Sequence, residues 1–198
     1  MSTEREDPGV RWMLAYQAGE EAAFDRIVEG YSGQVWSLLT RFLGPHPRRE
    51  DLVQEVFLRV IRARASYTPS ARLSTWLYRI AFNLAANERD RSRVRAERSL
   101  EVVRSAGDDA VVEVVDEAAP APDAAMQRED VVTAVRTAIA ELPEKQRMAM
   151  LLARYEELPY AEIAVVLDSS EKAIKSLIHR ARETLRARLA PFLSEEVA

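Results

Sequence analysis

The sequence has no cysteine and only two histidines, His46 and His179, which lie far apart in the chain. Without cysteine, disulfides, cysteine nucleophiles and thiolate metal sites are excluded. Two distant histidines leave little material for imidazole metal sites or catalytic triads. The 198 residues also contain no uncharged apolar run of about 18 residues, which a membrane-spanning helix requires.

The first ten residues, MSTEREDPGV, are polar and acidic and lack the basic-then-apolar order of a signal peptide. We therefore expect no membrane insertion and a cytoplasmic location. An enzyme is disfavoured, because the sequence has no phosphate-binding glycine loop, no nucleophile motif and no spacing typical of metal ligands. The acid pairs Glu50-Asp51 and Glu156-Glu157 are expected on solvated helical faces. No cofactor and no metal site are predicted.

Charge is strongly segregated along the chain, although the formal net charge is only -4. Residues 48–95 carry eleven arginines against five acids, whereas residues 96–130 carry three arginines against ten acids. Such segregation indicates a basic segment suited to a polyanion, followed by an acidic segment. The negative net charge of the whole chain does not prevent nucleic-acid binding by a local basic surface, because salt screens the interaction between charges more than about 8 Å apart.

Helical periodicity dominates the first half of the chain. Apolar residues recur at three- and four-residue spacings from Arg11 to Leu43, with a break expected at Gly30. The Gly44-Pro45 pair cannot continue a helix, so a loop is expected there. Four helices are predicted, over Arg11–Glu29, Tyr31–Leu43, Arg48–Arg64 and Leu73–Arg95.

The pattern fails over Ser99–Pro122, where small and acidic residues surround the run AAPAPDAA. Such a composition buries little apolar surface and predicts a flexible acidic linker, with a short strand at Val111–Val115 as the alternative. Periodicity returns near Ala125 and continues in helices over Glu144–Tyr155 and Pro159–Leu167. The predicted fold is therefore all-α, with two small helical modules at residues 8–95 and 125–192 joined by a linker at 96–124.

The stretch LPYAEIAVVLDSSEKAIKSLIHRAR, residues 158–182, has the pattern of a helix-turn-helix. Asp168-Ser169-Ser170 is turn chemistry, and either serine can cap the second helix. Ile174, Ile178 and Ala181 form a buried stripe, which leaves a basic outer face of the kind that enters the major groove. An ordinary helical hairpin with a solvated basic face is the alternative reading of this stretch alone.

Taken together, the two modules resemble bacterial extracytoplasmic-function (ECF) sigma factors, which contain only sigma regions 2 and 4. The segments REDLVQEVFLRVIR and STWLYRIAFNLAANERDRSR are similar to region 2 of that family. The segments LPEKQRMAMLL and LPYAEIAVVLDSSEKAIKSLIHRARETLRARL are similar to region 4. The resemblance covers nearly the whole chain apart from the linker.

The resemblance implies two binding surfaces in the first module. One docks on the clamp helices of the RNA polymerase β′ subunit, through Asp51, Gln54, Glu55 and Phe57, with Phe57 equally compatible with the core. The other opens the −10 promoter element and holds its unpaired bases, through Ser66, Tyr67, Ser74, Asn83, Arg89 and Arg91. Arginine suits this surface because it both stacks on bases and pairs with phosphates. Trp76 lies on the apolar stripe and is assigned to the core.

In the second module the resemblance implies a surface that reads the −35 element, formed by Ser170, Lys172, Lys175, Ser176, His179 and Arg180. The chain departs from the family pattern at Lys172-Ala173, where Gly-Thr is frequent, and at Leu177, where arginine is frequent. The usual −35 preference of the family therefore does not transfer. Asp168 replaces a frequent turn glycine, and aspartate tolerates that conformation better than most residues.

The sequence thus predicts an alternative sigma factor that binds polymerase core and directs promoter recognition and melting, without enzymatic activity of its own. Its expected partners are the β′ clamp helices and the β flap of polymerase core, promoter DNA and an anti-sigma factor. A conventional helix-turn-helix regulator is the alternative, but it would explain only the second module and leave Arg48–Arg95 without a role.

Overall fold

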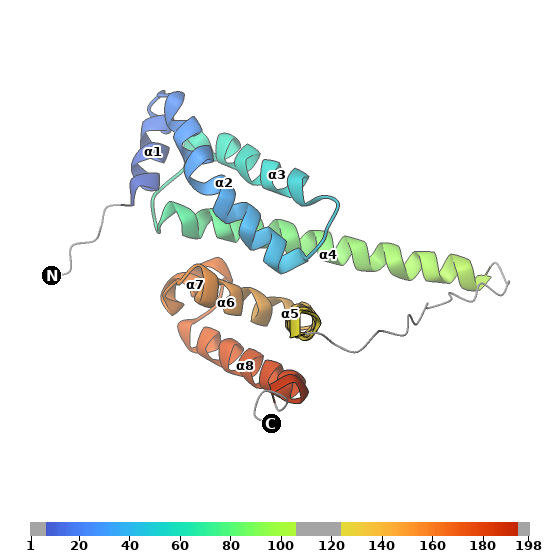
Figure 1. The fold of residues 1–198 in the computed structure, drawn as a ribbon. Helices are drawn as coiled ribbons and strands as arrows, with labels where there is room; N and C mark the ends of the chain where they lie inside the picture. Colours follow the sequence, from blue (N-terminus) through green and yellow to red (C-terminus); the bar gives the residue numbers. More distant parts are fainter. Residues whose placement is uncertain (1–6, 106–123, 194–198) are drawn as a thin grey trace.

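The computed structural model describes residues 7–105 and 124–193, and every regular element within these ranges is helical. Eight α-helices and one short 3₁₀ helix follow one another along the described chain (Figure 1). Their bounds are α1 Pro8–Gln17, α2 Ala22–Leu43, α3 Arg49–Ala63, η1 Arg64–Ser66, α4 Leu73–Ser105, α5 Ala124–Ala140, α6 Glu144–Tyr155, α7 Tyr160–Val166 and α8 Glu171–Leu193. The predicted all-α fold is confirmed.

Helices α1 to α4 pack into one bundle around an apolar core. Asp7 ties this bundle together at the beginning of two helices. Its Oδ1 accepts hydrogen bonds from Gly9 N, in the first turn of α1, and from the Tyr31 hydroxyl, both at 3.0 Å. Its Oδ2 accepts a 2.6 Å hydrogen bond from Leu73 N, the first residue of α4. One carboxylate therefore caps α1 and α4 together, because both helix starts carry free N–H groups.

The predicted helix break at Gly30 is wrong. The chain breaks between α1 and α2 instead, where Gly19 adopts a φ of +109° that favours glycine. Gly30 lies inside α2, where a side chain would crowd the indole of Trp12, because a Cβ at this position would lie 3.0 Å from Trp12 Cζ3. Glycine at this position allows α1 and α2 to pack closely. The sequence pattern alone did not distinguish a glycine at a helix–helix contact from a glycine that ends a helix.

Helix α4 is longer than its apolar periodicity predicts. It continues past Arg95 to Ser105 and projects beyond the rest of the bundle (Figure 1). The first part of the predicted linker is therefore helical. The remaining part, including the strand considered at residues 111–115, lies outside the described residues.

Helices α5 to α8 form the second bundle. The predicted helix-turn-helix is present as α7 and α8, joined by a tight turn. Asp168 has a φ of +47° in this turn, the left-handed conformation expected at a position where glycine is frequent. Ser170 caps α8, because its Oγ accepts a 3.2 Å hydrogen bond from Ala173 N.

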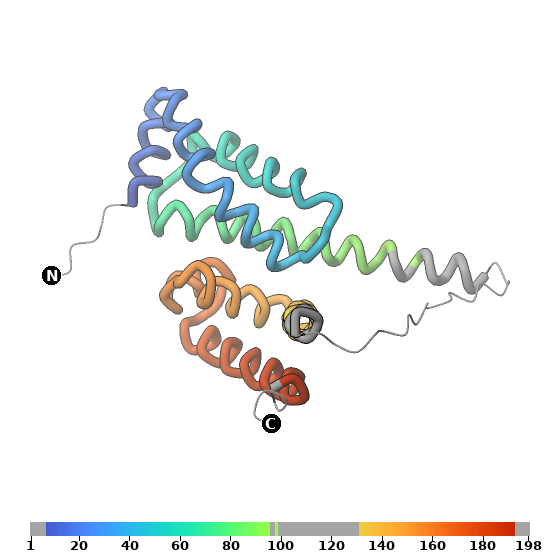
Figure 2. The backbone as a smooth tube through the Cα atoms, in the orientation of Figure 1, coloured from blue at the N-terminus to red at the C-terminus, as the bar shows by residue number. Residues whose placement is uncertain are grey.

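The two bundles pack directly against each other. Helix α6 contacts α2, and α7 contacts α4. Figure 2 shows α6 and α7 alongside the α2–α4 pair, although the sequence separates them widely. Buried residues of both bundles belong to one continuous apolar cluster. The prediction of a solvated Glu156 is wrong, because its side chain is only 10% exposed at this junction.

None of the described helices is long and apolar enough to cross a membrane. Within the same residues, no group of three or more histidine, aspartate or glutamate side chains is arranged to hold a metal ion.

Candidate functional surfaces

The first candidate surface is the exposed face of α3. Asp51 and Gln54 are exposed and Glu55 is partly exposed, on the side of the helix opposite the buried Leu52 and Val56. Asp51 Oδ2 lies 3.5 Å from Arg48 Nε. The structure therefore places the three polar residues together on one side of α3, as the predicted polymerase contact requires.

Two arginines on the same helix hold Glu55. Its Oε1 lies 3.3 Å from Arg59 Nε and 2.9 Å from Arg62 Nη1. These hydrogen bonds, that of Arg59 first, hold the pKa of the Glu55 carboxyl below its ordinary value of 4.5. The two arginines therefore fix the Glu55 carboxylate on the surface of α3.

Phe57 is placed apart from these residues. Its side chain is only 7% exposed and belongs to the core. The neighbouring Leu58 is 44% exposed, one turn from Gln54 and Glu55. Ile61, one turn further along the same helix, is 42% exposed, so two apolar side chains lie next to each other on this side of α3. Leu58 rather than Phe57 is therefore the apolar residue of the REDLVQEVFLRVIR segment that is open to a partner.

The second candidate surface comprises the η1–α4 loop and one side of α4. Ser66 and Asn83 are exposed, whereas Tyr67 and Ser74 are partly buried. Gln17 Nε2 donates a 3.1 Å hydrogen bond to the Tyr67 carbonyl, which fixes the loop to α1. The Tyr67 ring packs edge-on against Trp76, with ring centroids 5.3 Å apart. Trp76 is half-buried, so the loop rests on an aromatic platform that remains partly open.

The basic end of this surface is organised by a buried acid. Glu88 is buried, and its Oε2 lies 2.8 Å from Arg48 Nη1 and 4.0 Å from Arg91 Nη1. Arg91 is exposed and can reach a phosphate, while Arg89 is half-buried and faces Glu144 of α6 at 3.6 Å. The two predicted arginines are therefore in different environments, one open and one engaged by the second bundle.

The third candidate surface is the first half of α8. Its six predicted residues, Ser170, Lys172, Lys175, Ser176, His179 and Arg180, are all exposed. The buried Ile174, Ile178 and Ala181 lie on the opposite side. Glu171 is 3.1 Å from Lys175, and Glu183 is 3.5 Å from His179 Nδ1. The structure brings these predicted residues together on an open helical face that follows a tight turn, the geometry of a recognition helix.

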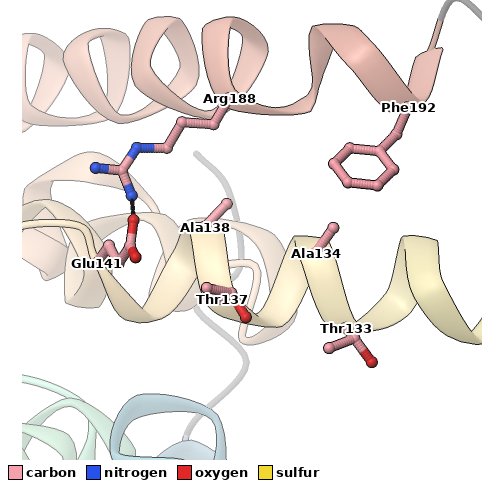
Figure 3. Close-up of a pocket in the computed structure, with 7 residues that line it drawn as sticks. All are labelled: Thr133, Ala134, Thr137, Ala138, Glu141, Arg188 and Phe192. Atoms are coloured by element: carbon pink, nitrogen blue, oxygen red, sulfur yellow. Dashed lines mark ion pairs between the residues drawn. The ribbon is translucent and has the colours of Figure 1, made fainter. Parts of the chain in front are cut away.

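A groove between α5 and α8 lies apart from that face. Small side chains of α5, including Ala134 and Ala138, line one wall, and Phe192 lines the other (Figure 3). Glu141 and Arg188 form an ion pair across it. The lining contains no cluster of groups suited to catalysis, so the groove adds no chemistry to the three surfaces.

Comparison with known proteins supports the resemblance of both modules to sigma regions 2 and 4. Residues 27–95 match the family described as Sigma-70 region 2, and residues 133–185 match Sigma-70, region 4. RNA polymerase sigma-H factor of Pseudomonas aeruginosa is 33% identical over 183 residues, which are 90% of this chain and 92% of that protein. This chain belongs to the ECF RNA polymerase sigma factors. The ECF sigma factor SigW of Bacillus subtilis is 32% identical, over 86% of this chain and 91% of its own length.

Solved structures show the same fold. CnrH, in a structure with the cytosolic domain of CnrY, superposes with a TM-score of 0.64 at 23% identity, covering 91% of this chain and 96% of that chain. RpoE of Bartonella quintana, in a structure with the anti-sigma factor NepR, superposes with a TM-score of 0.58 at 19% identity. The match covers 84% of this chain and 96% of that chain. As an ECF sigma factor, the protein directs RNA polymerase to promoters and is not an enzyme.

Proposed function

We propose that the three surfaces divide the work of promoter recognition by this sigma factor. The α3 face, with Asp51, Gln54 and Glu55, binds the β′ clamp helices, with Leu58 rather than Phe57 as its apolar contact. The loop and α4 residues, Ser66, Tyr67, Ser74, Asn83, Arg89 and Arg91, engage the −10 element. The exposed face of α8 reads the −35 element. The observation that carries the proposal is the joint exposure of all six predicted α8 residues.

The remaining partners follow from the same assignment. The β flap of polymerase core is the proposed contact of the second module. An anti-sigma factor is the proposed regulator, because the Bartonella RpoE was solved with the anti-sigma factor NepR. We place the protein in the cytoplasm, where polymerase acts. The functional unit of the first module is proposed to be residues 8–95 and that of the second residues 125–192, with the linker at 96–124.

Within α8 we expect a division between affinity and specificity. Lys175 and Arg180 lie one turn or more into the helix and carry full charges, so each should contact a phosphate. Replacing either by glutamine should weaken binding to all −35 sequences and reduce the salt dependence, log Kd against log salt, by about one unit. Replacing Lys172 or Ser176 by alanine should instead change which −35 bases are tolerated.

The experiment measures binding of a −35 promoter duplex, and of a set of single-base variants, at several salt concentrations. Arg186→Gln is the matched control, because this residue is exposed two turns further along α8, away from the predicted surface. An equal loss of affinity on every duplex for all four variants would show that α8 anchors DNA without reading it. No loss relative to the control would refute the assignment of α8 to DNA.

A further inference from the structure

Helix α4 carries a row of arginines beyond the part that packs in the first bundle. Arg91, Arg95 and Arg98 are all exposed, and they follow one another at spacings of four and three residues. Residues at these spacings lie next to each other on one side of an α-helix. Val94, on the same side, is 38% exposed. The three arginines therefore form one open basic strip, which we call the α4 arginine row.

The row lies where α4 extends past the other helices of its bundle (Figure 1). Beyond Glu88, none of the α4 side chains that the structure describes is buried. Most of the stability of a helix in a protein comes from packing one of its faces, and this stretch has no packed face. A partner bound along the row would supply the missing stabilisation.

The acid closest to the row does not neutralise it. Glu88 is buried, and its Oε2 lies 4.0 Å from Arg91 Nη1 but only 2.8 Å from Arg48 Nη1. The charge of Glu88 is therefore balanced mainly by Arg48, which begins from another part of the bundle. Arg91 remains 66% exposed and keeps its donors available for a ligand.

The outer part of the row has even less compensation. Among the residues that the structure describes, Arg95 and Arg98 form no ion pair. Asp90 lies on a neighbouring side of the helix, where it pairs with Arg93 at 3.8 Å. The row thus keeps its positive charge, although an acid and a further arginine lie within the same turns of α4.

Charge and spacing favour a nucleic-acid backbone as the ligand. Guanidinium groups bind phosphates through paired hydrogen bonds, and arginine is the residue best suited to this contact. At about 1.5 Å per residue, Arg91 and Arg98 are about 10.5 Å apart along the helix axis. Each DNA strand carries a phosphate about every 3.4 Å along its axis, so a duplex lying along α4 would present about three base pairs to the row.

The order of residues in the proposed −10 surface indicates which DNA lies there. In that assignment the unpaired bases lie near the η1–α4 loop and the beginning of α4, and Arg91 lies at the opposite end. DNA that continues along α4 past Arg91 therefore leads away from the melted bases. On that side of the −10 element the promoter is double-stranded and runs toward the −35 element.

We propose that the α4 arginine row is a further DNA-binding site of this sigma factor, which binds the phosphates of the double-stranded spacer immediately upstream of the −10 element. Its place on the promoter rests on the proposed −10 assignment, whereas its binding to duplex DNA does not. Contacts to phosphates carry no base information, so the row adds affinity for every spacer sequence. It holds the duplex beside the point where the strands separate.

The test compares two fluorescent probes bound by the sigma factor together with polymerase core. One probe is the single-stranded non-template −10 sequence, and the other adds a double-stranded spacer of about ten base pairs, one turn of DNA. Arg95→Gln with Arg98→Gln should weaken binding only to the probe with duplex, and the slope of log Kd against log salt should fall by about two. The advantage of the unmodified protein on this probe should therefore shrink by about tenfold between about 50 and about 200 mM salt.

Two variants control for effects on the helix itself. Arg93→Gln is the matched control, because Arg93 lies in the same stretch of α4 but pairs with Asp90. This variant should bind both probes like the unmodified protein. Arg95→Lys with Arg98→Lys keeps both charges and should retain most of the affinity for the duplex probe. Arginine, glutamine and lysine have similar helix propensities, and circular dichroism checks that α4 stays helical.

Three results would overturn the proposal. An equal loss on both probes would mean that the row does not contact the spacer. A loss of polymerase binding, measured by co-purification without DNA, would assign the row to the polymerase. Unchanged binding to both probes would make the row a solvated helix end.

Failure of the −10 assignment gives a different pattern. Asn83→Ala, within the proposed −10 surface, would then bind the single-stranded probe as well as the unmodified protein does. A loss confined to the duplex probe in the Arg95→Gln, Arg98→Gln variant would still support the arginine row as a site for duplex DNA. The two proposals therefore fail independently.

Discussion

Replacing Arg147 by methionine should destabilise the whole protein, although Arg147 lies in none of the proposed binding surfaces. Its side chain is only 3% exposed and lies over the Phe42 ring, with the guanidinium carbon 5.4 Å from the ring centroid. Burial lowers its pKa to about 10, so the guanidinium remains charged at neutral pH. Methionine keeps most of the apolar stem and removes the charge and every donor.

The expected magnitude follows from the two hydrogen bonds that the Arg147 guanidinium donates, to the Phe42 carbonyl at 2.8 Å and to the Leu142 carbonyl at 3.2 Å. A hydrogen bond to a charged group contributes about 1.5–3 kcal/mol, and two carbonyls at helix ends lose their partner in the variant. The cost of burying the charge, which the lowered pKa reports, is removed together with the charge and offsets part of this loss. We therefore expect the free energy of unfolding to fall by about 2–4 kcal/mol.

Urea unfolding followed by circular dichroism at 222 nm measures this change. Arg26→Met is the matched control, because the Arg26–Glu20 ion pair is largely exposed and should contribute about 1 kcal/mol or less. A loss below about 1 kcal/mol for Arg147→Met would mean that water satisfies both carbonyls equally well, and would refute the reasoning.

Three further expectations concern the first module. Gly9→Ala should destabilise it by about 1–3 kcal/mol, because the new methyl group would overlap with Tyr31 and Leu73. Gly33→Ala should instead stabilise it by about 1 kcal/mol, because Gly33 lies inside α2 with open space around it. Urea unfolding compares the two variants. The Glu55 carboxyl should titrate below 4.5 by carbon-13 NMR and move upward in Arg59→Gln, and its contribution to stability should be present above pH 4.5 and lost as the pH falls through its lowered pKa. Asp51→Arg with Glu55→Arg should abolish co-purification with polymerase core without loss of helicity.

The charge reversal has its own control. Asp25→Arg with Glu29→Arg changes the same residue types at the same four-residue spacing on the exposed side of α2. This variant should retain polymerase binding. Undiminished core binding by the α3 variant, or equal loss in both variants, would remove the α3 face from the interface.

For Gly9→Ala, an unchanged free energy of unfolding would show that the tight contact with Tyr31 and Leu73 relaxes without cost.

Individual helices could be predicted because each has its own apolar stripe and end signals. Helix α6 was predicted over Glu144–Tyr155 and has these bounds, and α3 differs from its prediction by one residue at each end. The exposed face of α8 could be predicted because Ile174 and Ile178 recur at the helical period and define the opposite, buried side. These are local properties, set by the helical period and by turn residues.

Properties that depend on distant residues could not be predicted in the same way. Gly30 was expected to end a helix, but it accommodates Trp12 from another helix. Glu156 was expected in water, but it accepts a hydrogen bond from Tyr78 of the other module. Nothing in the periodicity of either segment specifies which helix will lie against it, so contacts between modules were beyond the sequence argument.

The Asp7 carboxylate has a topological consequence for the first module. By bonding Leu73 N, 66 residues away, it closes the α1–α3 segment into a ring at the start of α4. The entropy cost of closing such a ring rises only with the logarithm of its length, so each doubling of the segment adds about 0.6 kcal/mol. The loops within the ring can therefore change length at little thermodynamic cost, while the start of α4 remains fixed by a side chain near the beginning of the protein.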